Sequence, residues 1–264
     1  MEQVEKGQIT VSTENIFPII KQFLYSEQEI FLRELISNAV DATSKLKTLS
    51  SKGVASGELG DLTIEVIINK DARTLTIRDK GIGLTADETK KYLNQVAFSS
   101  AQEFLDKYKE DANIIGHFGL GFYSAFMVAD KVEVDTLSYQ EGAQPVIWSC
   151  SGDTSFELSP SHRTGRGTDI ILHLSDDAQQ YLDENKIQEL LDKYCKFLPI
   201  PIQLGMKKKN ITEGEGDDKK EKEIEVPNII NNTNPLWKKS PSDLKDEDYL
   251  AFYNELYPFS RPPL

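Results

Sequence analysis

Three polar residues with hydrogen-bond acceptor groups recur at helical spacing in the first quarter of the chain. Glu34, Asn38 and Asp41 lie at positions i, i+4 and i+7 of an uninterrupted helical pattern from Glu29 to Leu49, which places them within about 60° of one another on an α-helix. Two carboxylates and an amide would then face out through a gap in an apolar core, where they could hold a polar ligand or take a proton from water. Alternatively, this stripe, extended by Lys45, is the solvated face of an amphipathic helix.

A second candidate site follows a predicted strand. Asp79 ends that strand and is followed by Gly81 and Gly83. A carboxylate beside two glycines suits a position where a ligand approaches the backbone closely. A polar turn that closes a hairpin has the same composition, so this short pattern leaves both interpretations open.

Three glycines precede an apolar segment further along. Gly116, Gly119 and Gly121 come just before the apolar residues 122–128, so backbone N–H groups at a helix start could form a cradle for phosphate. The spacing matches neither the dinucleotide fingerprint nor the P-loop. Close packing of a helix against a sheet is the alternative use of these glycines.

Alternating and helical patterns predict the elements that position these groups. Strands are predicted at 8–12, 62–69, 73–79, 131–138, 146–150, 154–158, 168–174 and 199–204, and helices at 16–24, 29–49, 87–109, 185–197 and 242–256. The second and third strands should form an antiparallel hairpin, and the three strands between residues 131 and 158 an antiparallel meander. Thr168 lies at the mouth of the strand that follows a glycine turn at 165–167.

Composition limits the classes of function. The chain has 264 residues, of which 39% are hydrophobic and 28% charged, as in an ordinary globular protein with one large domain, or one domain plus a fragment. The net charge of −13 disfavours nucleic-acid and membrane partners. Cys150 and Cys195 need no disulfide, and no apolar leader or membrane-length run is present. We therefore expect a cytoplasmic protein.

The last part of the chain changes in character. Residues 205–226 are charged and of low complexity, which predicts a linker or an exposed hairpin tip. Residues 227–264 contain Trp237 and a helical pattern that would be capped at Ser242 or Asp243. Because its aromatic residues have no local partners, we predict the start of a second domain here, after a first domain at 1–204. The three histidines lack metal-ligand spacing and are expected to be structural.

Four groups of residues, taken in order, resemble the nucleotide-binding motifs of the gyrase, heat-shock chaperone, histidine kinase and MutL ATPase superfamily. They are Glu34-x-x-x-Asn38-x-x-Asp41, Asp79-x-Gly81-x-Gly83, Gly116-x-x-Gly119-x-Gly121 and Gly167-Thr168. Within that superfamily, residues 31–42, 115–129 and 167–174 resemble the ninety-kilodalton heat-shock chaperones. Residues 234–258 resemble the start of that family's middle domain, and the short charged segment is similar to that of bacterial members.

The resemblance, together with the hairpin and meander, implies an α+β two-layer sandwich. This Bergerat fold has a mixed, largely antiparallel eight-stranded sheet with helices on one face, and ATP lies between the two layers. The implied function is an ATP-dependent chaperone that hydrolyses ATP to ADP with Mg²⁺, closes a lid, and forms a transient homodimer in the full-length protein while acting on unfolded or partly folded client proteins. The family's phosphate-contacting arginine lies in the middle domain, so this chain should bind ATP better than it hydrolyses it.

The resemblance also implies roles for single residues. Glu34 would be the general base for the attacking water, and Asn38 would hold Mg²⁺ with phosphate oxygens and water. Asp79 would accept a hydrogen bond from the adenine amino group, with Thr168 in the same network. The other implied contacts are Gly83 and Leu84 in the base pocket, Asp41 and Ala42 on its helical wall, and backbone N–H groups of Gly119, Gly121 and Phe122 at the phosphates.

The expected lid, residues 93–116, and its surroundings depart from the family pattern. Phe98, in the predicted nucleotide contact set, replaces a usual lysine and brings no positive charge. Tyr92 replaces an asparagine near the ribose, Ser100-Ala101 replaces Gly-Thr, and His117 replaces a glutamine. These differences affect the expected contacts to ribose and phosphates.

Three other functions stay open on the sequence. A mismatch-repair or topoisomerase ATPase that acts on DNA is disfavoured by the negative charge and by the last segment. A nicotinamide-dependent oxidoreductase built on the glycine loops is disfavoured by the scarcity of βαβ units. A nucleotide-sensing interaction module without turnover is the third.

Overall fold

The computed structural model describes residues 27–95, 100–108, 114–116, 119–153, 155–213, 220–257 and 260–261. The strand predicted at 8–12 and the helix predicted at 16–24 lie outside these ranges, as do Phe98 and His117. No described helix combines the length and apolar character that crossing a bilayer requires.

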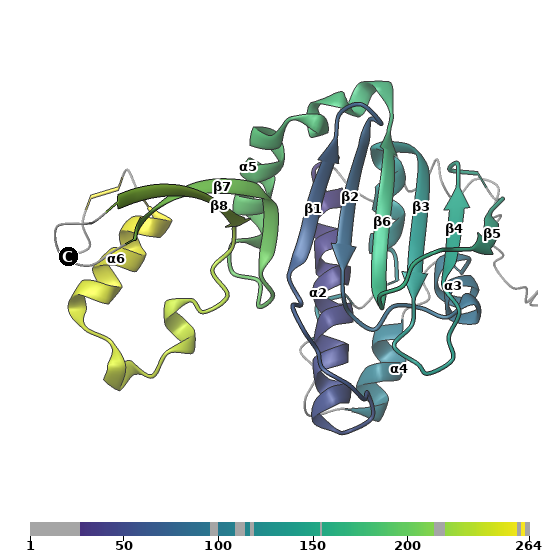
Figure 1. The fold of residues 1–264 in the computed structure, drawn as a ribbon, viewed down its shortest axis with the longest axis horizontal. Helices are drawn as coiled ribbons and strands as arrows, with labels where there is room; N and C mark the ends of the chain where they lie inside the picture. Colours follow the sequence, from purple (N-terminus) through teal and green to yellow (C-terminus); the bar gives the residue numbers. More distant parts are fainter. Residues whose placement is uncertain are drawn as a thin grey trace, which may run out of the picture.

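A single mixed sheet forms one layer of the molecule (Figure 1). Its strand order is β5-β4-β3-β6-β2-β1-β7-β8. The strands are β1 (Ile64–Asn69), β2 (Thr74–Asp79), β3 (Ala129–Leu137), β4 (Val146–Cys150), β5 (Glu157–Pro160), β6 (Gly167–Leu174), β7 (Ile202–Glu213) and β8 (Lys220–Ile229). Among them β1 and β7 pair in parallel and the other neighbours pair antiparallel. The predicted mixed, largely antiparallel sheet is confirmed.

Helices form the second layer. Figure 1 shows α2 (Ile30–Ser51) running behind the central strands, with α3 (Ala86–Leu93) and α4 (Ser100–Lys107) on the same side. The remaining helical segments are η3 (Gly121–Met127), η4 (Asp176–Leu182), α5 (Glu184–Cys195), η6 (Leu236–Lys238), η7 (Pro241–Asp243) and α6 (Asp246–Leu256). This arrangement confirms the predicted α+β class.

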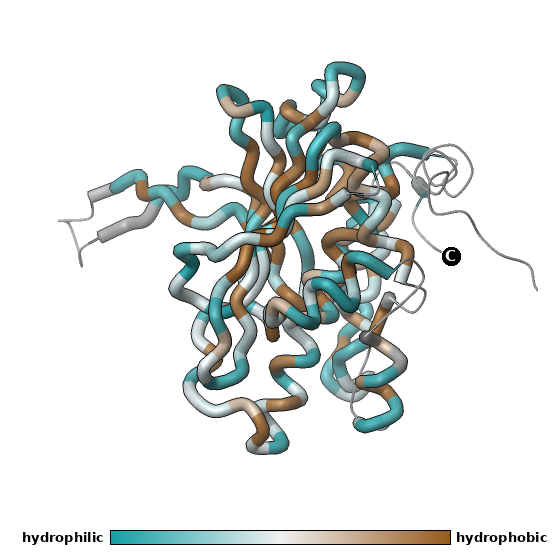
Figure 2. The backbone as a smooth tube through the Cα atoms, turned by 90° about the vertical axis from the view of Figure 1, so that its right-hand side faces the viewer, coloured by the Kyte–Doolittle hydropathy of each residue, from teal (hydrophilic) through white to brown (hydrophobic). Residues whose placement is uncertain are grey.

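The core lies between α2 and the inner face of the sheet. The apolar flanks of α2 place Phe31, Leu35 and Ile36 there without exposure, opposite fully buried strand residues such as Leu172. Alternation along the strands sends every second side chain inward, and in Figure 2 the hydrophobic stretches gather where strands and helices meet. Because α2 is apolar on both flanks of its polar stripe, the helix is held in one rotation about its axis.

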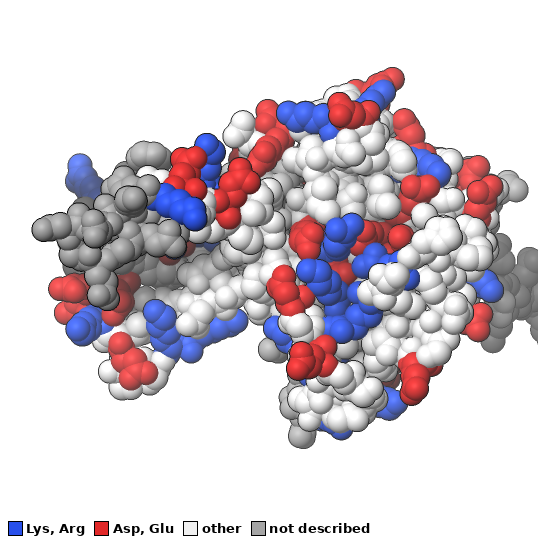
Figure 3. All heavy atoms as spheres, viewed as in Figure 1, with Lys and Arg blue, Asp and Glu red and all other residues white. Residues whose placement is uncertain are grey.

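The opposite face of the sheet is charged. In Figure 3, which has the same orientation as Figure 1, basic side chains cluster near the middle of this face with acidic ones around them. Arg78 of β2 and Asp169 of β6 are paired there at 2.7 Å. The residues on either side of Arg78 and of Asp169 in sequence point to the inner face of the sheet. A charged side chain on the outer face thus alternates with buried side chains on the inner face in both strands.

The charged segment 205–226 forms much of an antiparallel hairpin in the described residues. In the pairing of β7 with β8, Met206 lies opposite Pro227 at one end and Glu213 lies opposite Lys220 at the other. The Lys208 ammonium group and the Glu223 carboxylate form an ion pair across the two strands at 2.7 Å. Of the two predicted alternatives, the hairpin is therefore the one observed, and β8 was missed as a strand. Such a sequence can still form strands because cross-strand ion pairs replace an apolar face at a solvated sheet edge. Residue 204 lies inside β7, and the division into domains at that point stays a prediction.

Several predicted elements differ from the observed ones. The helix expected at 87–109 is observed as α3 and α4, and α3 ends at Leu93, before Asn94, a residue of low helix propensity. The strand expected at 154–158 begins at Glu157, and the segment after Gly121 is a 3-10 helix. Helix α6 begins at Asp246, after Pro241–Asp243 have formed their own short turn, because the Lys245 N–H donates to the Asp248 carboxylate at 2.9 Å.

The aromatic residues of the last segment do have a partner in the described chain. The partner is Phe197, which follows α5. The ring of Trp237 meets it edge-on with centroids 4.8 Å apart, and the ring of Phe252 lies tilted against it at 5.9 Å. Asn231 holds the start of this segment, because its side chain accepts the Ile202 N–H at 2.7 Å and donates to the carbonyl oxygens of Leu198 and Ile200. The hydrogen bonds of Asn231 thus hold the backbone in place where the chain leaves β8.

Replacing Leu172 by alanine should test the packing between the layers. Leu172 is fully buried in the central strand β6, so the change should lower the free energy of unfolding by about 2–5 kcal/mol. Urea denaturation followed by circular dichroism measures it. Leu250→Ala, at a leucine that is 43% exposed, is the matched control and should cost less than about 1 kcal/mol. Equal losses for both variants would contradict this description of the core.

Candidate functional site

The polar stripe of α2 lies against backbone from the glycine-containing turns. A β-carbon placed at Gly81 would lie 2.6 Å from the carbonyl carbon of Ala42, and one placed at Gly121 would lie 2.7 Å from Oε2 of Glu34. The contact at Gly81 is with the backbone of α2, so a residue with a side chain would push this turn away from the helix. The contact at Gly121 is with the end of a flexible side chain, so a larger residue there would displace the Glu34 carboxylate rather than the turn.

Asp41 anchors the turn that contains Gly116. Its side chain is buried, and its two oxygens accept the N–H groups of Ile115 and Gly116, each at 2.8 Å. The N–H of Gly116, predicted as part of a phosphate cradle, is therefore already bonded to protein. Asp41 was predicted on the wall of a base pocket, and the structure gives it this additional task of holding the backbone turn.

Glu34 lies at the partly exposed end of the stripe. The Arg33 guanidinium donates to its Oε1 from Nη2 at 2.7 Å and from Nε at 3.2 Å, and the side chain of Glu34 is 24% exposed. A carboxylate in this position is reachable from solvent while Arg33 holds its orientation. Sequence reasoning missed Arg33, because an adjacent pair on a helix does not share a face.

Asn38 lies between the two carboxylates of the stripe. A β-carbon at Gly116 would be 3.5 Å from its Oδ1 and 3.3 Å from Oδ2 of Asp41, so the amide borders the same turn. In the described parts of the chain no three His, Cys, Asp or Glu residues are grouped to hold a metal. An amide oxygen that supplies one ligand while other oxygens come from a bound molecule and water suits Mg²⁺, which binds few protein groups.

Asp79 is a buried carboxylate at the end of β2. It is 5% exposed and lies opposite Thr168 of β6 in the sheet register, and its Oδ1 accepts the Gly81 N–H at 2.8 Å. Burial raises the pKa of Asp79 to about 7, because the charged form loses solvation, while the Gly81 N–H and the positive charge of Arg163 act in the opposite direction. A buried acid with so large a shift is a candidate for function.

The turn after Asp79 is fixed between α2 and β3. Ile82 donates its N–H to the carbonyl of Ala42 at 3.2 Å and accepts the N–H of Tyr139 at 2.8 Å. Gly83 has φ of +59°, and a β-carbon there would lie 1.9 Å from the Leu137 carbonyl oxygen. The sequence left open whether this segment is a turn or a site, and the structure shows a rigid turn that carries a buried carboxylate at its start.

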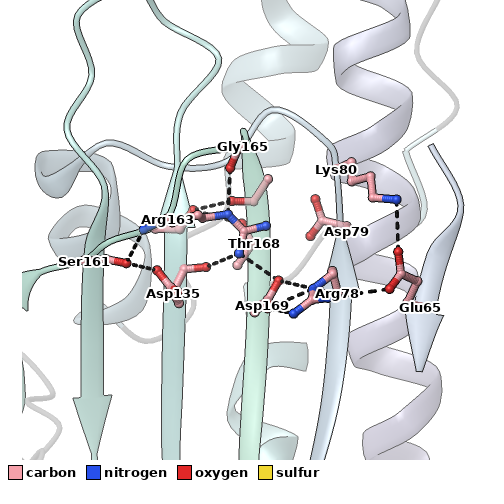
Figure 4. Close-up of polar contacts among 12 residues, drawn as sticks. Glu65, Arg78, Asp79, Lys80, Asp135, Ser161, Arg163, Gly165, Thr168 and Asp169 are labelled. Atoms are coloured by element: carbon pink, nitrogen blue, oxygen red, sulfur yellow. Dashed lines mark hydrogen bonds and ion pairs between the residues drawn. The ribbon is translucent and has the colours of Figure 1, made fainter. Parts of the chain in front are cut away.

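Arginines on the outer face of the sheet secure the strands that carry Asp79 and Thr168 (Figure 4). Arg78 donates from Nε and Nη2 to Asp169 at 2.7–3.0 Å, and Arg163 donates to the same carboxylate at 2.8 Å. Burial alone would raise the pKa of Asp169, but hydrogen bonds from the two guanidinium groups lower it. Sequence reasoning missed this network, although charged residues that alternate with buried ones in β2 and β6 were a signal for it.

The other predicted site residues are dispersed around this centre. Thr168 and Leu84 both contact the side chain of Thr136, which sequence reasoning missed. Phe122 packs its ring on Trp148 with centroids 5.6 Å apart. Gly119 has φ of +65°. Tyr92, expected near a ribose, donates its hydroxyl to Glu103 of α4 at 3.1 Å.

Comparison with known proteins gives matches over nearly the whole chain. A family model described as histidine kinase-, DNA gyrase B- and HSP90-like ATPase matches residues 25–150. The chain is 60% identical over 262 residues to the chaperone protein HtpG of Bacteroides fragilis and 54% identical over 261 residues to that of Porphyromonas gingivalis. These alignments cover 99% and 98% of this chain and 37% of each relative. The chain thus spans well under half the length of these relatives.

Because the pKa of Asp79 is raised, we predict that the free energy of unfolding depends on pH through this residue. The pKa is higher in the folded protein (about 7) than the ordinary value of 3.8. The contribution of Asp79 to stability is therefore fully present below about pH 4 and is lost as the pH rises through about 7. Between pH 5 and 8, Asp79→Asn should gain on the order of 2 kcal/mol in unfolding free energy relative to the unchanged protein, measured by urea denaturation.

Asp61→Asn is the control for this titration. The pKa of Asp61 is lowered by hydrogen bonds from the side chain and backbone of Thr63, so its contribution is lost on acidification and the difference should be flat from pH 5 to 8. A flat difference for Asp79→Asn as well would mean that its carboxylate is not desolvated.

Proposed function

We propose that the chain, whose residues 25–150 match the histidine kinase-, DNA gyrase B- and HSP90-like ATPase family model, is the nucleotide-binding part of an ATP-dependent chaperone that hydrolyses ATP to ADP and phosphate. The observation that carries the proposal is the buried carboxylate of Asp79, fixed by Gly81 next to the polar stripe of α2. The similarity to chaperone proteins named HtpG supports it.

Asp79 recognises the base in this proposal. Its carboxylate accepts a hydrogen bond from the adenine amino group, and a donor from the ligand favours the charged form that burial disfavours. Thr168 belongs to the same network from the neighbouring strand. Gly83 and Leu84 line the pocket from the turn, while Asp41 and Ala42 form its wall on α2. The fixed turn between α2 and β3 supports this assignment, because recognition by one acceptor requires that the acceptor does not move.

The phosphates lie toward the other end of the stripe. Backbone N–H groups of Gly119, Gly121 and Phe122 bind them, and Asn38 holds Mg²⁺, which neutralises phosphate charge when bound. Glu34 accepts the proton of the attacking water. The closeness of Gly121 to Glu34 supports this assignment, since it brings the proposed phosphate-binding backbone and the proposed base together.

The remaining parts of the proposal concern the longer protein. Because the chain covers 37% of its HtpG relatives, we assign to the full-length protein the remodelling of unfolded clients, lid closure that includes Phe98, and transient dimerisation. In this proposal residues 1–204 are the nucleotide domain, 205–226 the connection and 227–264 the beginning of the next domain. Two free, buried cysteines suit a reducing, cytoplasmic location.

Replacing Asp79 by asparagine should abolish ADP binding. Asparagine keeps the shape of the side chain but exchanges one acceptor oxygen for a donor NH₂, which faces the amino group of the base. We expect a loss in ADP affinity of about 100-fold or more, measured by isothermal titration of the 264-residue chain with ADP and Mg²⁺. Asp61→Asn, at an exposed aspartate, is the control. Unchanged ADP affinity in Asp79→Asn would refute the pocket assignment.

Replacing Glu34 by glutamine should separate binding from turnover. We expect ADP affinity to stay within about 3-fold, whereas ATP hydrolysis by the full-length protein should fall by about 100-fold or more, because glutamine cannot take a proton from water. Glu29→Gln, whose glutamate pairs with Lys186 and Lys193, is the matched control and should keep hydrolysis. Loss of ADP binding in Glu34→Gln would mean that Glu34 is structural.

A further inference from the structure

A fully buried threonine connects the two halves of the proposed base site. Thr136 lies on β3 with no exposed surface, and three groups surround its hydroxyl oxygen. The Leu84 N–H donates to it at 2.9 Å, the Gly167 carbonyl oxygen lies at 3.2 Å, and the Thr168 hydroxyl lies at 3.0 Å. The turn after Asp79 and the strand that carries Thr168 therefore meet at one atom.

The hydrogen-bonding capacity of a hydroxyl selects one arrangement of these contacts. A hydroxyl donates one proton and accepts two. All three contacts are hydrogen bonds only if Thr136 donates to Gly167 and accepts from both Leu84 and Thr168. Since buried polar groups are as a rule paired, this arrangement is favoured. In this arrangement Thr168 donates its one hydroxyl proton to Thr136. Toward any other group, the Thr168 hydroxyl can then act only as a hydrogen-bond acceptor.

The sheet register places this pair in line with Asp79. Asp79 is opposite Thr168 in β2 and β6, and Thr168 is opposite Thr136 in β6 and β3, so the three side chains form one row on the inner face. One residue earlier or later, Arg78, Asp169 and Asp135 form the corresponding row on the outer face (Figure 4). The ion pair of Arg78 with Asp169 joins β2 to β6. Arg163, in the loop before β6, donates to the Asp169 carboxylate at 2.8 Å and to the Asp135 carbonyl oxygen of β3 at 3.3 Å, so these contacts support the register of the inner row.

We propose that Thr136 is a positioning residue that sets base specificity by fixing Thr168 as a hydrogen-bond acceptor, a proposal that rests on the nucleotide-binding function proposed above. A carboxylate at Asp79 and an acceptor hydroxyl at Thr168 together favour a purine that presents an amino group at its 6-position. They disfavour one that presents a carbonyl oxygen there, because that oxygen finds no donor. By holding the Leu84 N–H, Thr136 also keeps the turn from Gly81 to Leu84 in place.

The test compares ADP with inosine diphosphate, which carries a carbonyl oxygen in place of the 6-amino group. Isothermal titration of the 264-residue chain with each nucleotide and Mg²⁺ gives the ratio of the two affinities. In Thr136→Val the shape is kept and the hydroxyl is lost, so Thr168 is free to turn and donate. We expect the preference for ADP to fall by about 10-fold, chiefly through tighter relative binding of inosine diphosphate.

Three further variants complete the test. Thr136→Ser keeps the hydroxyl and should keep the preference within about 3-fold of the unchanged chain. Thr136→Ala also removes the hydroxyl and replaces Thr136→Val in the test if that variant does not fold. The preference for ADP should fall by the same amount in either variant. Thr89→Val is the matched control and should keep the preference, because Thr89 is also fully buried and its hydroxyl donates to the carbonyl oxygen of Thr85, the N-cap of α3, at 2.8 Å.

The outcomes separate this inference from the function on which it rests. If the unchanged chain binds ADP and Thr136→Val loses affinity for both nucleotides equally, the ratio is unchanged and Thr136 has only a structural role. A change of the ratio in Thr136→Ser as large as in Thr136→Val would also overturn the inference, since the hydroxyl would then not be responsible. If the unchanged chain binds neither nucleotide, the proposed function itself is wrong.

Discussion

The site depends on backbone contact between α2 and the glycine turns. Gly81 approaches the backbone of Ala42 more closely than a residue with a side chain could, Gly121 lies against the Glu34 carboxylate, and Asp41 bonds two further backbone N–H groups. These turns come from segments about 40 to 90 residues further along the chain, yet the same helix positions all of them. The rotation of α2 is in turn set by its two apolar flanks against the sheet. Packing of the core thus decides where polar groups of the site lie.

Two aspartates, Asp79 and Asp169, are buried in the sheet, and they have different hydrogen-bond partners. Asp169 has two arginine partners, and its carboxylate is stabilised in the charged form. Asp79, one residue away in register on the opposite face, has the Gly81 N–H but no cation in direct contact among the described residues. Burial disfavours the charged form at both residues, but the two guanidinium groups offset this effect at Asp169 and nothing comparable offsets it at Asp79. Such a cost is typical of groups kept for binding.

Local patterns in the sequence were sufficient for part of the site. The stripe of Glu34, Asn38 and Asp41 follows from helical periodicity, and Asp79 from its place between a strand and two glycines. The contacts of Thr136 could not be predicted, because they depend on the register of β3, β6 and β2, which are far apart in the chain. The same is true of the ion pairs of Asp169. For the fold, β8 was missed because a charged alternating strand at a sheet edge resembles a linker in composition.

The protonation of Asp79 has a consequence for any molecule that occupies the site. With its pKa at about 7, the free protein near neutral pH is a mixture of molecules with a charged and with a neutral carboxyl group. A ligand that donates a hydrogen bond to Asp79 selects the charged molecules, so its binding releases protons from the molecules that were neutral. The heat measured on binding then includes ionisation of the buffer, and affinity rises with pH until the carboxyl group is fully charged.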